Sequence, residues 1–171
     1  AITAELCGGR IPTGGAATKS WRSAFDRLHG IPADIGQFTE AGMTDPEVGR
    51  LTFARVLNRN PTDQEMARLL GAYLEQLVKE VEQSPGYRVM PGVMALLPRL
   101  VDAGMMLGLV TGALEGAAHI KLARASLNRF FSFGGYGSDS SGRGELPRMA
   151  IDRCCRRHAH RAAPVRGLVA G

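Results

Sequence analysis

The sequence predicts an α/β protein with a parallel-sheet core and an all-helical insertion near its start. Apolar residues recur at helical spacing over 16–87, and no strand-like run interrupts them. After this stretch, helical patterns alternate at short intervals with apolar runs, which is typical of α/β proteins. The unbroken apolar run at 105–110 suits a strand buried on both faces of a parallel sheet. We therefore expect an all-helical block over residues 16–87 and an α/β region after it.

Three helices are expected within the insertion. The first follows a Gly-rich turn at 13–15, carries apolar residues on one face and stops at Gly30. The second begins at 44–47, where a polar capping residue precedes a proline in the first turn. The third opens with Thr62 and Glu65 at capping-box spacing and continues into the most regular apolar stripe of the chain.

The core is expected to begin with a helix that opens at Pro91-Gly92. Its buried side is expected to carry Val93, Leu96, Leu97, Leu100 and Val101. The later expected elements are the strand at 105–110, a helix over 115–126, a strand at 131–133, a Gly- and Ser-rich loop over 134–144, a helix from about 145 and a weak strand at 165–170.

Composition excludes several classes of protein. The chain has 171 residues, of which 44% are apolar and 22% charged, and it is long enough to bury a core without disulfides. No apolar run approaches the roughly 18 residues that a membrane span needs. Three cysteines cannot form a disulfide framework, so we expect a reducing, cytoplasmic setting. The net charge of +5 comes from five arginines after residue 152, so it does not indicate a nucleic-acid partner.

The segment 107–112 carries the strongest functional signal. A buried strand ends here in Thr111 and Gly112, and a helix follows. Ligands of open α/β sheets bind beyond the carboxyl ends of the strands, where a hydroxyl and main-chain N–H groups can hold a phosphate or another oxyanion. An interpretation of equal weight is that Thr111 only caps the following helix.

Residues 87–153 resemble the core of the haloacid dehalogenase (HAD) superfamily, especially its phosphoglycolate-phosphatase-like members. The helical block 16–87 resembles the cap of that family, so the resemblance implies a Rossmann-like core formed by residues 1–15 and 88–171 with a helical cap over 16–87. The matching segments are Met90-Pro91-Gly92-Val93, Gly108-Leu109-Val110-Thr111-Gly112, Lys121-Leu122, the run 133–139, Glu145-Leu146-Pro147, Thr13-Gly14-Gly15 and Gly42-Met43-Thr44-Asp45. Their order and spacing extend the resemblance over nearly the whole chain.

The resemblance implies a phosphatase that acts on a small phosphorylated metabolite through an aspartyl-phosphate, with Mg²⁺ as cofactor. It assigns the transferring phosphoryl group to Thr111 and Lys121, although Lys121 is equally compatible with a solvated helix position. It places Gly112 and Ala113 beside the substrate and makes Arg143 a further substrate-binding candidate. A cation and a basic side chain are needed because a carboxylate nucleophile and a phosphate ester repel each other.

Two positions depart from the family pattern. Family spacing puts Glu5 where the nucleophilic Asp should stand and Cys7 where the acid/base Asp should stand, and it makes both of them candidate Mg²⁺ ligands. Glu is one methylene longer than Asp, and Cys is a poor ligand for Mg²⁺. Only three apolar residues precede Glu5, so we expect a truncated or altered first strand. The later metal-binding Asp of the family would follow directly after Gly171.

Two functions therefore stay open at this stage. The chain is either a HAD-type phosphatase or a non-catalytic HAD-like pseudoenzyme or fragment that binds anions or a partner. An underfilled sheet would favour low stability or oligomerisation.

The residues Cys154, Cys155, His158 and His160 could also suggest a zinc site. Adjacent helical residues point about 100° apart, so we favour a solvated or frayed helix end.

Overall fold

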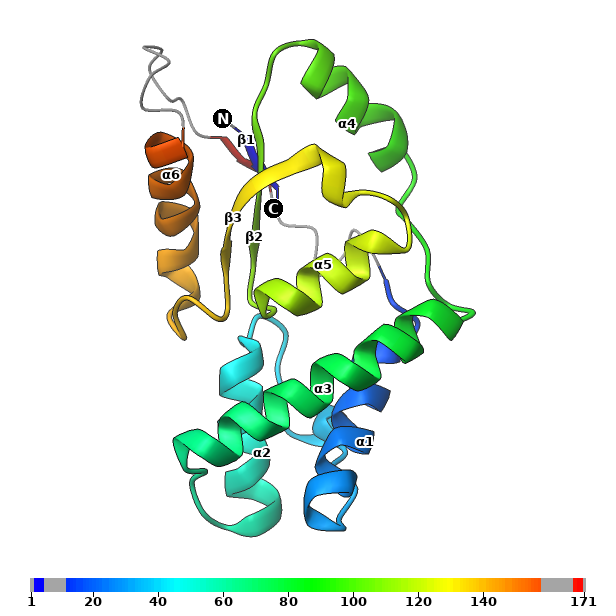
Figure 1. The fold of residues 1–171 in the computed structure, drawn as a ribbon, viewed down its shortest axis with the longest axis vertical. Coiled ribbons are helices and arrows are strands. Elements are labelled where there is room, and N and C mark those ends of the chain that lie inside the picture. Colours follow the sequence, from blue (N-terminus) through cyan, green and yellow to red (C-terminus); the bar gives the residue numbers. More distant parts are fainter. Residues whose placement is uncertain (1, 5–11, 158–167, 171) are drawn as a thin grey trace.

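The computed structural model describes residues 2–4, 12–157 and 168–170. It confirms the α/β fold class: a parallel sheet flanked by helices lies next to a group of three helices (Figure 1). The elements are β1 (Ile2–Ala4), α1 (Ala16–His29), α2 (Asp45–Leu57), α3 (Asp63–Gln83), α4 (Val93–Asp102), β2 (Leu107–Thr111), α5 (Glu115–Ala123), β3 (Phe131–Tyr136), α6 (Leu146–Arg157) and β4 (Leu168–Ala170). None of the helices in these ranges is long and apolar enough to cross a membrane.

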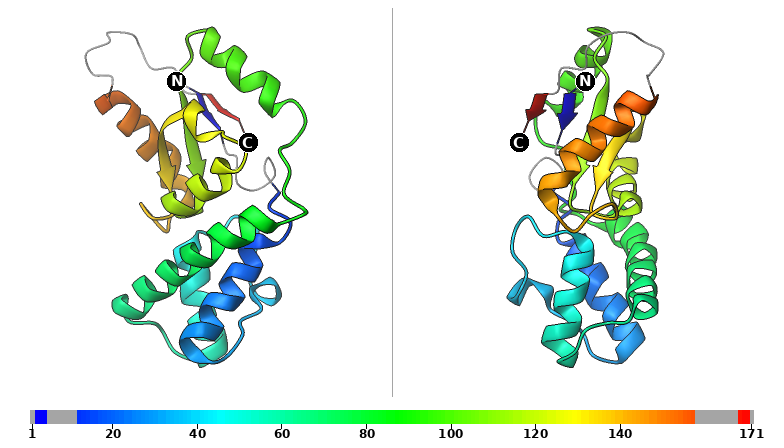
Figure 2. Two further views of the ribbon diagram at one scale, coloured as in Figure 1. Left: turned by 45° about the vertical axis from the view of Figure 1, so that its right-hand side comes forward. Right: turned by 90° about the vertical axis from the view of Figure 1, so that its left-hand side faces the viewer.

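The sheet has the strand order β3-β2-β1-β4, and all of its strand pairs are parallel. Leu107 and Leu109 of β2 pack with residues of α4 and α5, whereas Val110 packs with α6 on the other face (Figure 2). The apolar run of β2 is thus buried on both faces, as predicted. The carboxyl ends of β2 and β3 face the three helices α1–α3, which we call the helical block (Figure 1).

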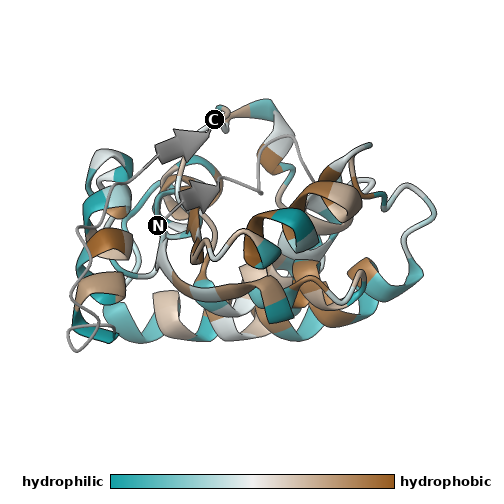
Figure 3. Cartoon of the chain, turned by 90° about the horizontal axis from the view of Figure 1, so that it is seen from above, coloured by the Kyte–Doolittle hydropathy of each residue, from teal (hydrophilic) through white to brown (hydrophobic). Residues whose placement is uncertain are grey.

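Aromatic residues fill the interior of the helical block. Trp21 stacks on Tyr73 with ring centroids 4.6 Å apart, and Phe25 meets Phe53 edge-on at 5.4 Å. The predicted capping box at the start of α3 is present, and α2 starts with another. Hydrophobic and hydrophilic residues share the same helices, which is how amphipathic helices cover a common core (Figure 3).

The sheet differs from expectation in the length of β3. This strand continues to Tyr136, so Gly134 and Gly135 belong to the sheet and not to the predicted loop. At Gly135 any side chain would meet the main chain of Leu146, so the glycine lets α6 approach the strand closely. The first strand is present but only three residues long, and it pairs with β2 on one side and β4 on the other.

The buried face of α4 also differs from expectation. Leu96 is 52% exposed and Val101 is 44% exposed, although their spacing predicted burial. Val93 and Leu97, which the same pattern predicted to be buried, are buried, because α4 packs on only one side, against β2 and its neighbours.

Candidate active site

The predicted phosphate-binding segment lies at the carboxyl edge of the sheet. Thr111 is the last residue of β2 and is in register with Tyr136, the last residue of β3. In β1, Ala4 is in register with Leu109, so β1 and β2 run toward the same edge. This edge is where open α/β sheets bind their ligands.

Thr111 holds the turn that follows β2. Its Oγ1 accepts a hydrogen bond from the Ala113 N–H at 3.1 Å, and the residue is 1% exposed. The N-cap of α5 is Leu114, which supplies no capping side chain. The alternative that Thr111 caps this helix is therefore wrong, because its hydroxyl closes the preceding turn.

The cap of α5 comes from a different helix. The Leu114 N–H donates to Oδ2 of Asp45 at 2.9 Å, and the Asp45 N–H donates to the Gly112 carbonyl at 2.8 Å. Asp45 is the first residue of α2, directly after the Thr44 N-cap. This reciprocal pair of hydrogen bonds ties the helical block to the turn after β2.

Burial raises the pKa of Asp45 above its usual value, against the positive charge of Lys121 and the hydrogen bond from Leu114, which both lower it. A carboxylate that leaves water for a partly apolar site is favoured in its neutral form. The positive charge of Lys121 thus acts on Asp45, and through Asp45 Lys121 interacts with the turn after β2. The main-chain carbonyl of Lys121 accepts a hydrogen bond from the Tyr87 hydroxyl at 2.7 Å.

Gly112 is packed so closely that only glycine fits. A Cβ there would lie 2.8 Å from the Met43 carbonyl oxygen and 3.1 Å from Nη1 of Arg143. Arg143 Nη1 also donates to the Gly42 carbonyl at 3.2 Å. The guanidinium group therefore lies between the turn after β2 and the segment 42–45 that leads into α2.

The structure brings together four of the predicted site residues: Thr111, Gly112, Ala113 and Arg143. Glu5 and Cys7, the predicted nucleophile, acid/base and metal ligands, lie outside the described residues. Sequence reasoning used Asp45 as part of a helix start and of the family-like segment 42–45, but it missed the hydrogen bond that joins Asp45 to Leu114. The polar cap and proline at 44–47 locate the helix correctly, but they carry no information about its partner across the fold.

No group of three His, Cys, Asp or Glu side chains within the described ranges could hold a metal ion. The described residues therefore do not make a Mg²⁺ site by themselves. At the predicted zinc candidate, Cys154 is buried and Cys155 is exposed, so the two thiols lie on different sides of α6. His158 and His160 lie outside the described residues.

Of the arginines before them, Arg156 and Arg157 are exposed, as expected of a solvated helix end, although Arg153 and Arg157 also contact the sheet and the loop after it. Arg153 binds both carboxylate oxygens of Asp139 at 2.6 and 2.7 Å, and Arg157 donates to the Ser132 carbonyl at 2.7 Å.

No family model matches the sequence, and no curated protein matches it. Solved structures do match the fold. CbbY from Rhodobacter sphaeroides in complex with phosphate matches with a TM-score of 0.68 and 17% identity over 98% of this chain and 75% of that chain. A predicted phosphoglycolate phosphatase from Haemophilus somnus matches with a TM-score of 0.64 and 16% identity over 92% and 71%.

A haloacid dehalogenase-like hydrolase from Streptococcus pneumoniae also matches, with a TM-score of 0.59 and 16% identity over 99% of this chain and 74% of that chain. A mutant of the same CbbY was solved with xylulose-(1,5)bisphosphate and matches with a TM-score of 0.66 and 17% identity over 98% and 75%. The chain thus has the fold of the haloacid dehalogenase-like phosphatases.

Proposed function

We propose that this chain is a HAD-like phosphatase that binds the phosphoryl group of a small phosphorylated metabolite at the turn 111–114. The observation that carries the proposal is the position of this turn: it follows β2 at the carboxyl edge of a HAD-like sheet and has a guanidinium group beside it. Matched proteins of the same fold bind phosphate and a sugar bisphosphate, which supports this class of ligand.

Each residue of the turn has a distinct role in the proposal. The Thr111 hydroxyl and the Gly112 N–H donate to phosphoryl oxygens, since oxyanions bind well to converging donors, and the Ala113 N–H joins them by exchanging its hydrogen bond to Thr111 Oγ1 for one to the ligand. Arg143 neutralises part of the ligand charge from the side of segment 42–45. Lys121 adds positive potential from α5, and α1–α3 serve as the cap.

The resemblance gives the attack on phosphorus to Glu5 and the proton transfer to Cys7. In that scheme Mg²⁺ shields the negative charges, but the described residues do not form its site, and we derive no step through it. Thr111 is 1% exposed, so a ligand reaches its hydroxyl only after a covering segment has moved. We propose segment 42–45 as the part that moves, because it covers Gly112 directly.

A non-catalytic HAD-like protein is the second candidate function. Glu5 and Cys7 stand in place of the two family aspartates, and the carboxylate of Asp45 already takes the N–H of Leu114. Both features favour a protein that binds an anion weakly and does not hydrolyse it. The cytoplasmic setting expected from the cysteine content is common to both candidates.

Turnover of p-nitrophenyl phosphate with and without Mg²⁺ separates the two candidates. We expect metal-dependent hydrolysis that is lost in Glu5→Gln and reduced about tenfold or more in Thr111→Val, which removes one hydroxyl bonded to a charged group. The control Thr18→Val, on an exposed position of α1, should leave turnover unchanged.

An inactive wild type that gains activity in the double variant Glu5→Asp, Cys7→Asp would support the second candidate. Both candidates fail if no variant turns over substrate and if phosphate does not shift the amide NMR signals of Gly112 to Leu114.

A further inference from the structure

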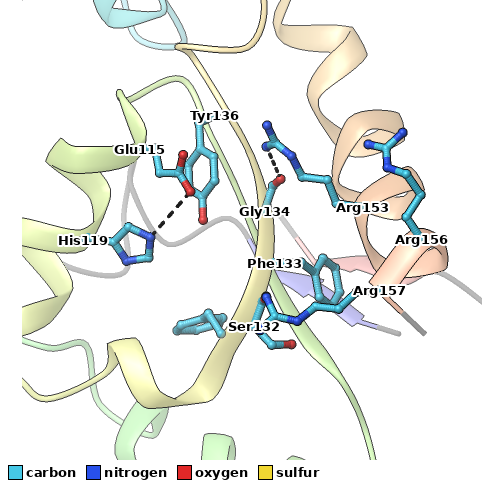
Figure 4. Close-up of a pocket in the computed structure, with 10 residues that line it drawn as sticks. Glu115, His119, Ser132, Phe133, Gly134, Tyr136, Arg153, Arg156 and Arg157 are labelled. Atoms are coloured by element: carbon cyan, nitrogen blue, oxygen red, sulfur yellow. Dashed lines mark hydrogen bonds and ion pairs between the residues drawn. The ribbon is translucent and has the colours of Figure 1, made fainter. Parts of the chain in front are cut away.

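A hollow lies along the outer side of β3, between α5 and α6, and its lining residues do not include those of the turn 111–114 (Figure 4). Its volume is about 610 Å³, which is within the range of small-molecule sites. Side chains from α5 line one wall and arginines from α6 line the other. We call it the edge groove.

Part of the positive charge of the arginine wall, that of Arg156 and Arg157, has no ion-pair partner among the described residues. Arg153, Arg156 and Arg157 share one face of α6, because residues three and four apart lie on the same side of a helix. Arg153 is paired with Asp139. Arg157 gives one N–H to the Ser132 carbonyl and keeps its other donors. Arg156 makes no ion pair or hydrogen bond with any part of the chain that the structure describes.

The floor of the edge groove offers main-chain donors. β3 is at the edge of the described sheet, so alternate residues turn their main-chain groups outward. The Gly134 carbonyl points outward, since it accepts a hydrogen bond from Arg153 at 2.7 Å. The N–H of the same residue points to the same side, because both main-chain groups of one strand residue face one neighbour. Gly134 has no side chain that could cover this N–H.

The opposite wall has the opposite charge. Glu115 and His119 lie one turn apart on α5, with 3.9 Å between Oε1 and Nε2. The His119 ring also lies against Tyr136, with centroids 5.9 Å apart. A carboxylate on this wall repels an anion but accepts hydrogen bonds from a hydroxyl or ammonium group. The two sides of the groove therefore differ in charge: arginines that can bind an anion lie on one side, and the Glu115 carboxylate, a hydrogen-bond acceptor, lies on the other (Figure 4).

We propose that the edge groove binds a small organic anion that has a hydroxyl or ammonium group at its other end. The oxyanion, a carboxylate or a phosphate, lies against Arg156, Arg157 and the Gly134 N–H. The donor end faces the Glu115 carboxylate. This site uses none of the residues of the turn 111–114, so it stands whether or not the chain hydrolyses phosphate esters.

The test is an NMR titration of the ¹⁵N-labelled full chain with malate, with glycerol 3-phosphate and with succinate, which lacks the hydroxyl. We expect saturable shifts of the Ser132 and Gly134 amides with the first two ligands and weaker binding of succinate. Tighter binding of malate than of glycerol 3-phosphate would indicate a carboxylate ligand, and the reverse order would indicate a phosphate ligand. Shifts at Gly112 and Leu114 report the other site separately.

Arg156→Gln should weaken the binding about tenfold, because it removes a charge-assisted hydrogen bond and leaves the contacts of Arg153 and Arg157 in place. The control is Arg148→Gln, which removes the same charge from an 88% exposed position of the same helix and should leave binding unchanged. Absence of saturable shifts at Ser132 and Gly134, or equal binding to Arg156→Gln and wild type, would overturn the proposal. Succinate binding as tightly as malate would overturn the role of Glu115.

Discussion

Replacing Asp45 by Ala tests whether the helical block and the turn after β2 are joined energetically. The change leaves the Leu114 N–H without its acceptor in a residue that is 7% exposed. An unsatisfied buried donor costs about 1–3 kcal/mol. For a chain of this length, each kcal/mol lowers the melting temperature by about 2–4 °C. We therefore expect Asp45→Ala to melt about 2–12 °C below the wild type in a thermal unfolding experiment followed by circular dichroism.

Asp63 provides a matched control, because it is also the first residue of a helix with a Thr N-cap and a capping box. It is exposed, so Asp63→Ala removes only the favourable interaction of an acid with the helix N-terminus, about 0.3–1 kcal/mol. The difference between the two variants isolates the bridge to Leu114. Equal melting temperatures for Asp45→Ala and Asp63→Ala would refute the bridge as a source of stability.

The pH dependence gives an independent check on the same carboxyl group. Burial raises the pKa of Asp45, so the folded protein binds its proton more tightly than the unfolded chain does. The stability that the group contributes is present below its ordinary pKa of 3.8 and is lost as the pH rises through the folded pKa. Asp45→Asn keeps an acceptor for Leu114 and carries no charge. The free energy of unfolding of Asp45→Asn in urea should therefore increase relative to that of the wild type as the pH rises. A difference between the two free energies that does not change with pH would contradict the raised pKa of Asp45.

Three further changes have effects that the packing determines. Gly112→Ala places a Cβ 2.8 Å from the Met43 carbonyl oxygen and should cost about 1–3 kcal/mol in urea unfolding. Leu77→Ala empties a fully buried position and should cost about 2–5 kcal/mol in the same assay. Burial raises the pKa of Asp139, but the hydrogen bonds from Arg153 and from the Tyr136 N–H outweigh it and hold this pKa below its usual value. Arg153→Met should therefore raise the Asp139 pKa in a ¹³C NMR titration, and an unchanged value would show that the ion pair is not formed in solution.

The parts of the fold that could be predicted are those set by neighbours in the sequence. The capping pair Thr62 and Glu65 fixes the start of α3, because both hydrogen bonds close within one turn. Gly30 ends α1 because it adopts a left-handed conformation, with φ of 68°, that other residues avoid. The apolar run before Thr111 predicts a doubly buried strand because only such a strand needs apolar residues on both sides.

The parts that could not be predicted depend on contacts between distant residues. Gly134 and Gly135 have the composition of a loop, yet they extend β3. A Cβ at Gly135 would meet the main chain of Leu146 in α6, and a Cβ at Gly134 would meet the ring of Tyr136, so both glycines are explained by packing that the local sequence does not show. The exposure of Leu96 follows from how much of α4 the sheet covers, which periodicity alone does not give. The hydrogen bond between Leu114 and Asp45 joins residues 69 positions apart, so no local sequence pattern predicts it.

The hydrogen bond from Leu114 to Asp45 also bears on anion binding at the turn after β2. An anion bound at the start of α5 and the carboxylate of Asp45 compete for one donor, the Leu114 N–H. A phosphoryl group brings more negative charge than a carboxylate, but it must also displace segment 42–45 from Gly112. In the function proposed above, phosphate affinity would therefore be the difference between a strong local interaction and the loss of the contact of segment 42–45 with Gly112. Movement of segment 42–45 and binding at the turn after β2 would then form one coupled equilibrium, in which each shifts the other by the same free energy.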